Sequence, residues 1–105
     1  MNAHYILDAD HNLVTTDRLT WTLFLEDLAR RRVAETFVGE IRISTVFLGI
    51  DHAFGLGPPL LFETMVFGGP HDGWLDRYST WDEAVAGHAR VVKRIQDGRD
   101  PEVTQ

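Results

Sequence analysis

The first long segment with a regular spacing of apolar residues lies near the start of the chain. Trp21, Phe24, Leu25 and Leu28 occupy positions i, i+3, i+4 and i+7. Residues at this spacing lie on one face of a helix. The pattern therefore predicts a helix over residues 18–31 that packs its apolar face against a sheet.

A second helix is predicted near the end of the chain, over residues 81–97. Thr80 and Glu83 have the spacing of a capping box, in which the two side chains satisfy the first free backbone N–H groups. Gly98 supplies the backbone conformation with which many helices end. The apolar stripe of this helix consists of Trp81, Ala84, Val85, His88, Val92 and Ile95.

Short runs rich in apolar and β-branched residues predict the strands. They are residues 4–7, 13–16, 33–38, 41–50 and 60–67. Glycine and proline interrupt residues 51–59 and 70–79, which are therefore expected to be loops. The order ββαβββα predicts an α+β fold, a small antiparallel sheet with two helices on one face. We expect one domain over residues 1–98 and a flexible tail over residues 99–105.

Composition narrows the class of protein. The chain has 105 residues and no cysteine, which excludes disulfides, thiolate metal sites and a cysteine nucleophile. Ten basic residues against sixteen acidic ones give a net charge of -6, so direct binding of nucleic acid is not expected. No apolar run is long enough to cross a membrane, and no signal peptide is evident, so we expect a cytoplasmic protein. A domain this small would gain burial from a homodimer or another partner.

One basic cluster, Arg30-Arg31-Arg32, stands out from the acidic background. Its functional interpretation is a contact with phosphate or with an acidic partner. Its structural interpretation is a set of cations at a helix C-terminus, where the helix dipole favours positive charge.

His88 and Glu63 are the candidate catalytic residues. His88 lies on the apolar stripe of the second helix, so it is either a buried neutral histidine or a histidine that exchanges protons in a cleft. Glu63 interrupts an otherwise apolar strand, and a buried carboxylate needs a partner. A Glu63–His88 contact would supply that partner. No other motif indicates catalysis, and the sequence favours a protein that is not an enzyme.

Two histidine–aspartate pairs, Asp51-His52 and His71-Asp72, lie in the two predicted loops. The intervening strand separates them by about 20 Å, from the rise per residue of a strand. Each pair alone offers too few ligands for zinc, so no metal or other cofactor is expected. The structural interpretation is that each aspartate caps a turn.

The same two loops carry apolar and aromatic side chains that fit protein recognition. Phe54 and Leu56 lie between glycines and prolines in one loop, and Trp74 and Tyr78 lie in the other. If exposed, they would be anchors for a partner, together with Asp51 and His52. If they fold back, they cap the core.

Two segments resemble a family of small proteins encoded by tailed phages and prophages. They are VFLGIDHAFGLGPPLLFETMVFGG over residues 46–69 and RYSTWDEAVAGH over residues 77–88. The opening Tyr5-Ile-Leu-Asp and Trp21 fit the same family, so the resemblance covers most of residues 4–93. It implies a phage context and no particular catalytic residue.

A phage context implies a class of functions rather than one activity. Small acidic phage proteins often bind and inhibit a host protein, and anti-CRISPR proteins are one such group, an analogy of size, charge and origin. We therefore expect an accessory protein that binds a host or phage protein, such as a host defence or nucleic-acid-processing protein. The alternatives are a small enzyme or metal- or nucleotide-binding protein using His88, Glu63 or the histidine–aspartate loops, and an oligomeric structural or virion-assembly component.

Overall fold

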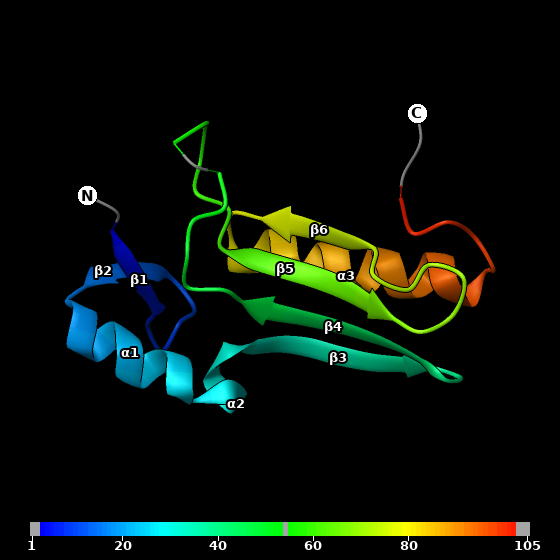
Figure 1. Ribbon diagram of the computed structural model, residues 1–105, viewed down its shortest axis with the longest axis horizontal. Helices are drawn as coiled ribbons and strands as arrows, with labels where there is room; N and C mark the ends of the chain where they lie inside the picture. Colours follow the sequence, from blue (N-terminus) through cyan, green and yellow to red (C-terminus); the bar gives the residue numbers. More distant parts are fainter. Residues whose placement is uncertain (1–2, 54, 103–105) are drawn as a thin grey trace.

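The computed structural model describes residues 3–53 and 55–102. Strands β1 and β2 form an antiparallel hairpin, and the other four strands form an antiparallel sheet of order β3-β4-β5-β6. The elements in chain order are β1 (His4–Leu7), β2 (Leu13–Thr16), α1 (Arg18–Glu26), α2 (Leu28–Arg31), β3 (Arg32–Val38), β4 (Ile41–Phe47), β5 (Phe62–Phe67), β6 (Leu75–Tyr78) and α3 (Trp81–Gln96) (Figure 1). The α+β class and the antiparallel pairing are confirmed.

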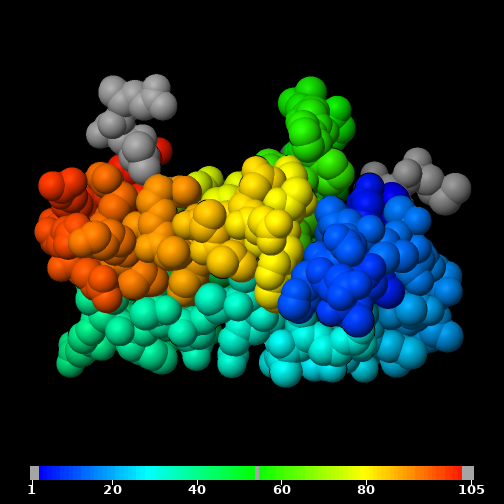
Figure 2. All heavy atoms as spheres, turned by 180° about the vertical axis from the view of Figure 1, so that it is seen from behind, coloured from blue at the N-terminus to red at the C-terminus, as the bar shows by residue number. Residues whose placement is uncertain are grey.

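Helix α3 covers one face of the four-stranded sheet and contacts all four of its strands. It lies behind the sheet in Figure 1 and towards the viewer in Figure 2. Successive residues of a strand point to opposite faces, so alternate side chains of the strands form the core against this helix. The core side chains that are fully buried include Ile43, Phe47, Phe62 and Val66 from the strands and Val91 from α3.

The N-terminal hairpin and α1 lie beside one end of the sheet rather than on its face (Figure 1). The ring of Phe24 on α1 meets the ring of Phe47 edge-on, with 5.7 Å between ring centres. The indole Nε1 of Trp21 donates a 2.9 Å hydrogen bond to the carbonyl oxygen of Gly49. Aromatic edge-to-face packing and a satisfied indole N–H both stabilise this junction.

Two differences from the sequence prediction concern the helices. The helix expected over residues 18–31 breaks at Asp27, which ends α1 and caps the N-terminus of α2 by accepting from the backbone N–H of Arg30. Leu28 therefore leaves the apolar stripe and is 69% exposed. The prediction that both helices share one sheet face is wrong, because α1 packs on β1. The N-cap half of the predicted capping box is confirmed, since Thr80 Oγ1 accepts from the backbone N–H of Glu83; Glu83 Oε1 accepts from the Thr80 hydroxyl.

Two further differences concern the strands and the tail. Residues 70–79, expected to be a loop, contain β6, which pairs with β5. The strands expected over 41–50 and 60–67 are shorter, because β4 ends at Phe47 and β5 begins at Phe62. Residues 99–102, expected in a flexible tail, pack on the domain through Pro101, which is fully buried. Residues 103–105 lie outside the described part of the chain.

Candidate functional site

The two candidate catalytic residues do not meet. His88 on α3 faces the sheet, whereas Glu63 on β5 points to the opposite sheet face and pairs with Arg77, with 3.0 Å between Oε2 and Nε. On β5 the residues on either side of Glu63, Phe62 and Thr64, are the ones that face α3. The expected Glu63–His88 contact is therefore wrong.

His88 instead belongs to a buried network of hydroxyl groups. Its Nδ1 lies 2.7 Å from the hydroxyl oxygen of Thr45, and its Nε2 lies 2.8 Å from that of Thr36. The hydroxyls of Thr45 and Thr64 share a further hydrogen bond of 2.5 Å. Burial lowers the pKa of His88, which favours the neutral ring. With no carboxylate in this network and 6% exposure, His88 fits the structural interpretation.

Tyr78 is a buried residue and not a surface anchor. It is 7% exposed, and its ring lies directly against Gly87 of α3, where a larger residue would collide with it. Burial raises the pKa of the Tyr78 phenol. Its hydroxyl group makes no hydrogen bond of normal geometry to any residue that the structure describes. The expectation that Tyr78 contacts a partner is wrong because β6 turns this side chain towards α3.

In the loop at residues 51–59, Asp51 and His52 make hydrogen bonds that join the two ends of the loop. Asp51 Oδ1 accepts from the backbone N–H groups of Ala53 (2.7 Å) and Leu60 (2.9 Å), so this carboxylate holds the loop closed. The backbone N–H of His52 donates to the carbonyl oxygen of Leu60. Leu56 is 84% exposed. Phe54 lies outside the described residues.

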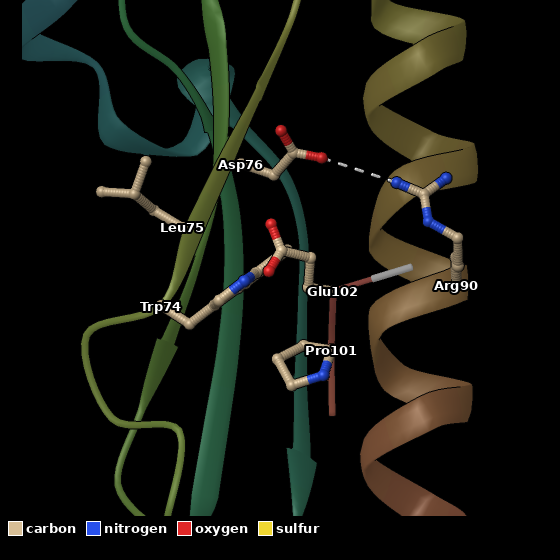
Figure 3. Close-up of a pocket in the computed structure, with 6 residues that line it drawn as sticks. All are labelled: Trp74, Leu75, Asp76, Arg90, Pro101 and Glu102. Atoms are coloured by element: carbon tan, nitrogen blue, oxygen red, sulfur yellow. Dashed lines mark ion pairs between the residues drawn. The ribbon is translucent and has the colours of Figure 1, made fainter. Parts of the chain in front are cut away.

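Trp74 lines a groove of about 480 Å³ between β6, α3 and the C-terminal segment. Figure 3 shows Asp76 and Arg90 pointing toward one another across this groove, at 3.7 Å. Leu75 points to the opposite side of the strand (Figure 3). Trp74 is half-buried and packs against the core cluster beneath α3, and its predicted contact with a partner stays a prediction.

The sheet face opposite α3 is a second candidate surface. No other helix or strand among the described residues packs across it (Figure 1). We call it the uncovered face. Its side chains form three rows that run across the strands, as the pairing register requires. The rows are Phe37, Arg42 and Phe67; Glu35, Ser44, Met65 and Leu75; and Arg32, Val46, Glu63 and Arg77.

Apolar groups on the uncovered face are open to solvent. Phe37 is 62% exposed, and Phe67 and Leu75 are each 38% exposed. Arg42 lies between the two phenylalanines, and its guanidinium is 4.9 Å from the ring centre of Phe67. Adjoining exposed apolar side chains among paired charges are typical of a protein-binding surface.

The charges on this face are organised by ion pairs. Arg42 Nε donates to Glu35 Oε2 at 2.7 Å, and Arg77 Nε donates to Glu63 Oε2 at 3.0 Å. The hydrogen bond from Arg42, together with the nearby charge of Arg32, lowers the pKa of Glu35. These pairs fix the long side chains in place, which reduces the entropy lost when a partner binds.

The basic cluster of the sequence divides between structural and surface positions. Arg30 lies over the ring of Phe24, 4.6 Å from its centre. Arg31 donates from Nε to the carbonyl oxygen of Phe47 (3.0 Å) and from Nη1 to that of Leu25 (3.2 Å). Arg32 begins β3 and lies exposed at one corner of the uncovered face.

Sequence reasoning placed the binding residues in loops and missed the uncovered face. The alternation of Phe62, Thr64 and Val66 with Glu63, Met65 and Phe67 is the signal that separates the two faces of β5. It was obscured because both sets contain apolar residues. Which set faces the helix depends on packing that a single strand does not specify.

Comparisons with known proteins leave the family open. The chain matches no family model, no curated protein and no solved structure. The described residues contain no group of three or more histidine, aspartate or glutamate side chains that could bind a metal ion. No helix in residues 3–53 or 55–102 is long and apolar enough to cross a membrane.

Proposed function

We propose that this chain is a phage or prophage accessory protein that binds another protein through the uncovered face of its four-stranded sheet. The observation that carries the proposal is that one sheet face packs on α3 while the other leaves Phe37, Phe67 and Leu75 exposed. Burial of apolar surface is the main favourable term in protein association, and this face has such surface to bury.

The phage context of the proposal comes from the sequence resemblance over residues 46–69 and 77–88. By analogy with small acidic phage proteins, the target is a host defence or nucleic-acid-processing protein in the bacterial cytoplasm. Binding alone would block such a target, and the proposal requires no catalytic step. The separation of Glu63 from His88 by the sheet supports this choice over an enzyme.

The experiment compares what the tagged protein captures from bacterial lysate with what two variants capture. The test variant carries Phe37→Ser and Leu75→Ser on the uncovered face. The matched control carries Leu19→Ser and Leu23→Ser on α1, which are 70% and 59% exposed in the native protein. Circular dichroism and thermal unfolding establish that both variants fold.

We expect the native protein and the α1 control to capture the same protein in near-stoichiometric amount, and the uncovered-face variant to lose it. Equal capture by all three proteins would contradict the proposal, as would loss in the α1 control alone. Recovery of only the chain itself from every sample would favour the oligomeric alternative.

A further inference from the structure

Positive charge is concentrated on the uncovered face and its corner. Four of the ten cations lie there, Arg31, Arg32, Arg42 and Arg77, against two of the sixteen acidic residues, Glu35 and Glu63. This region therefore carries a net charge of +2 in a chain whose net charge is -6. The rest of the chain holds six basic and fourteen acidic residues, a net charge of -8, so the uncovered face has the opposite sign to the rest of the chain.

Three of these four arginines line one groove. A groove of about 200 Å³ lies where α2 meets β3 and β4. Three arginines line it, Arg31, Arg32 and Arg42, together with Leu28, Ser44 and Val46. Its lining takes Arg42 from the first row of the face, Ser44 from the second, and Arg32 and Val46 from the third.

Two arginines of this groove are fixed by hydrogen bonds, and all three keep N–H groups that can donate to a ligand. An arginine side chain offers five N–H donors in a planar fork. Arg31 uses two of them on backbone carbonyls, and Arg42 uses one on Glu35. The guanidinium of Arg32 makes no hydrogen bond to another described residue, and its charge acts on Glu35. Carboxylates match the fork geometry of arginine in a way that apolar or basic groups do not.

We infer that the partner is an acidic protein surface that places a carboxylate side chain in this groove and covers Phe37 and Phe67 with apolar side chains. The inference rests on the proposed function and specifies the chemistry of its partner. Complementary charge would steer the two proteins together and set the orientation of binding.

The charge distribution argues against two other occupants. A second copy docked face to face would set four arginines against four arginines, and like charges at an interface are costly. A nucleic acid would be repelled by the net charge of -8 on the rest of the chain, and its phosphates would leave the phenylalanines without apolar partners. Both occupants are outcomes of the test below.

The test uses two synthetic peptides of equal length with leucine at alternate positions and either glutamate or lysine between them. Nuclear magnetic resonance follows the side-chain Nε–H signals of the arginines as each peptide, or a short DNA duplex, is added. We expect the glutamate peptide to shift the signals of Arg31, Arg32 and Arg42. We expect Arg32→Glu to weaken this binding at least about tenfold. The matched reversal Arg18→Glu on α1 should leave it unchanged.

Three results would overturn the inference: no shift with the glutamate peptide, equal shifts with the lysine peptide, or tighter binding of the duplex. Self-association of the free protein through these arginines would also overturn it. The capture experiment separates the two claims. If Arg32→Glu captures the partner as well as the native protein does, the partner chemistry is wrong while binding through the uncovered face stands.

Discussion

Glu35 on edge strand β3 accepts a 2.7 Å hydrogen bond from the Nε of Arg42 on the neighbouring strand β4. The same guanidinium lies over the ring of Phe67 on β5. One arginine thus joins three strands on the face that α3 leaves open. Its charge is held in place between apolar side chains, where a partner would meet it.

This pairing predicts how Glu35 titrates. Arg42→Gln removes the hydrogen bond that is the largest cause of the lowered pKa of Glu35, so the pKa should rise toward its ordinary value of 4.5. Arg32→Gln should raise the pKa less, because Arg32 acts through charge alone. Carbon-13 titration of the carboxylate measures both changes. An unchanged pKa in Arg42→Gln would show that the ion pair does not form in solution.

The burial of His88 predicts that the protein loses stability in mild acid. Burial lowers its pKa in the folded state below the ordinary value of 6.5, so the unfolded chain binds a proton that the folded chain does not. Stability from this group is therefore complete above pH 6.5 and falls as the pH drops toward the folded-state pKa. The slope from one such group is at most about 1.4 kcal/mol per pH unit.

Urea unfolding at pH 7.5 and pH 5.5 measures this effect. His88→Gln keeps a side chain that can both donate and accept, and it should reduce the loss between the two pH values. His71→Gln, at a half-buried position outside the hydroxyl network of His88, serves as the control and should retain the native loss. The same loss in both variants would exclude His88 as its source.

The placement of Glu63 gives a test of the catalytic alternative. Glu63→Gln should leave the titration of His88 unchanged, because the sheet lies between the two side chains and Glu63 pairs with Arg77. A proton-detected titration of the histidine ring measures this directly. A drop in the His88 pKa on removal of the carboxylate would restore the acid–base pair that the structure separates.

Gly87 controls the contact between α3 and β6. A Cβ atom at this position would collide with the ring and hydroxyl of Tyr78, so Gly87→Ala should destabilise the protein by about 1–3 kcal/mol, the usual cost of overpacking. Thermal or urea unfolding measures this change in the free energy of unfolding. Adding Tyr78→Leu should recover part of the loss, because it vacates the space. Full additivity of the two changes would contradict the proposed collision.

The sequence predicts elements well where local signals suffice. Thr80 and Glu83 define the start of α3, where Thr80 Oγ1 accepts from the backbone N–H of Glu83 and the Thr80 hydroxyl donates to Glu83 Oε1. The break at Asp27 had a local signal too, since aspartate is a favoured helix cap. The apolar stripe that continues to Leu28 concealed it.

The features that failed depend on tertiary contacts. Strand β6 has only four residues and forms because it pairs with β5. That pairing also determines that Tyr78 faces α3 while Leu75 and Arg77 face the other way. The site could not be found by looking for unusual residues, because Phe37 and Phe67 are ordinary strand residues. They become candidate binding residues only because they lie on the uncovered face.

The central claim is that a protein partner covers the face opposite α3. Its most direct test places a photo-crosslinking amino acid at position 37, and in a separate protein at position 85, which lies on the outer side of α3. Irradiation in bacterial cells should give one discrete adduct with another protein at position 37 and none at position 85. Adducts at position 85 alone, or adducts of the chain with itself at position 37, would contradict the claim.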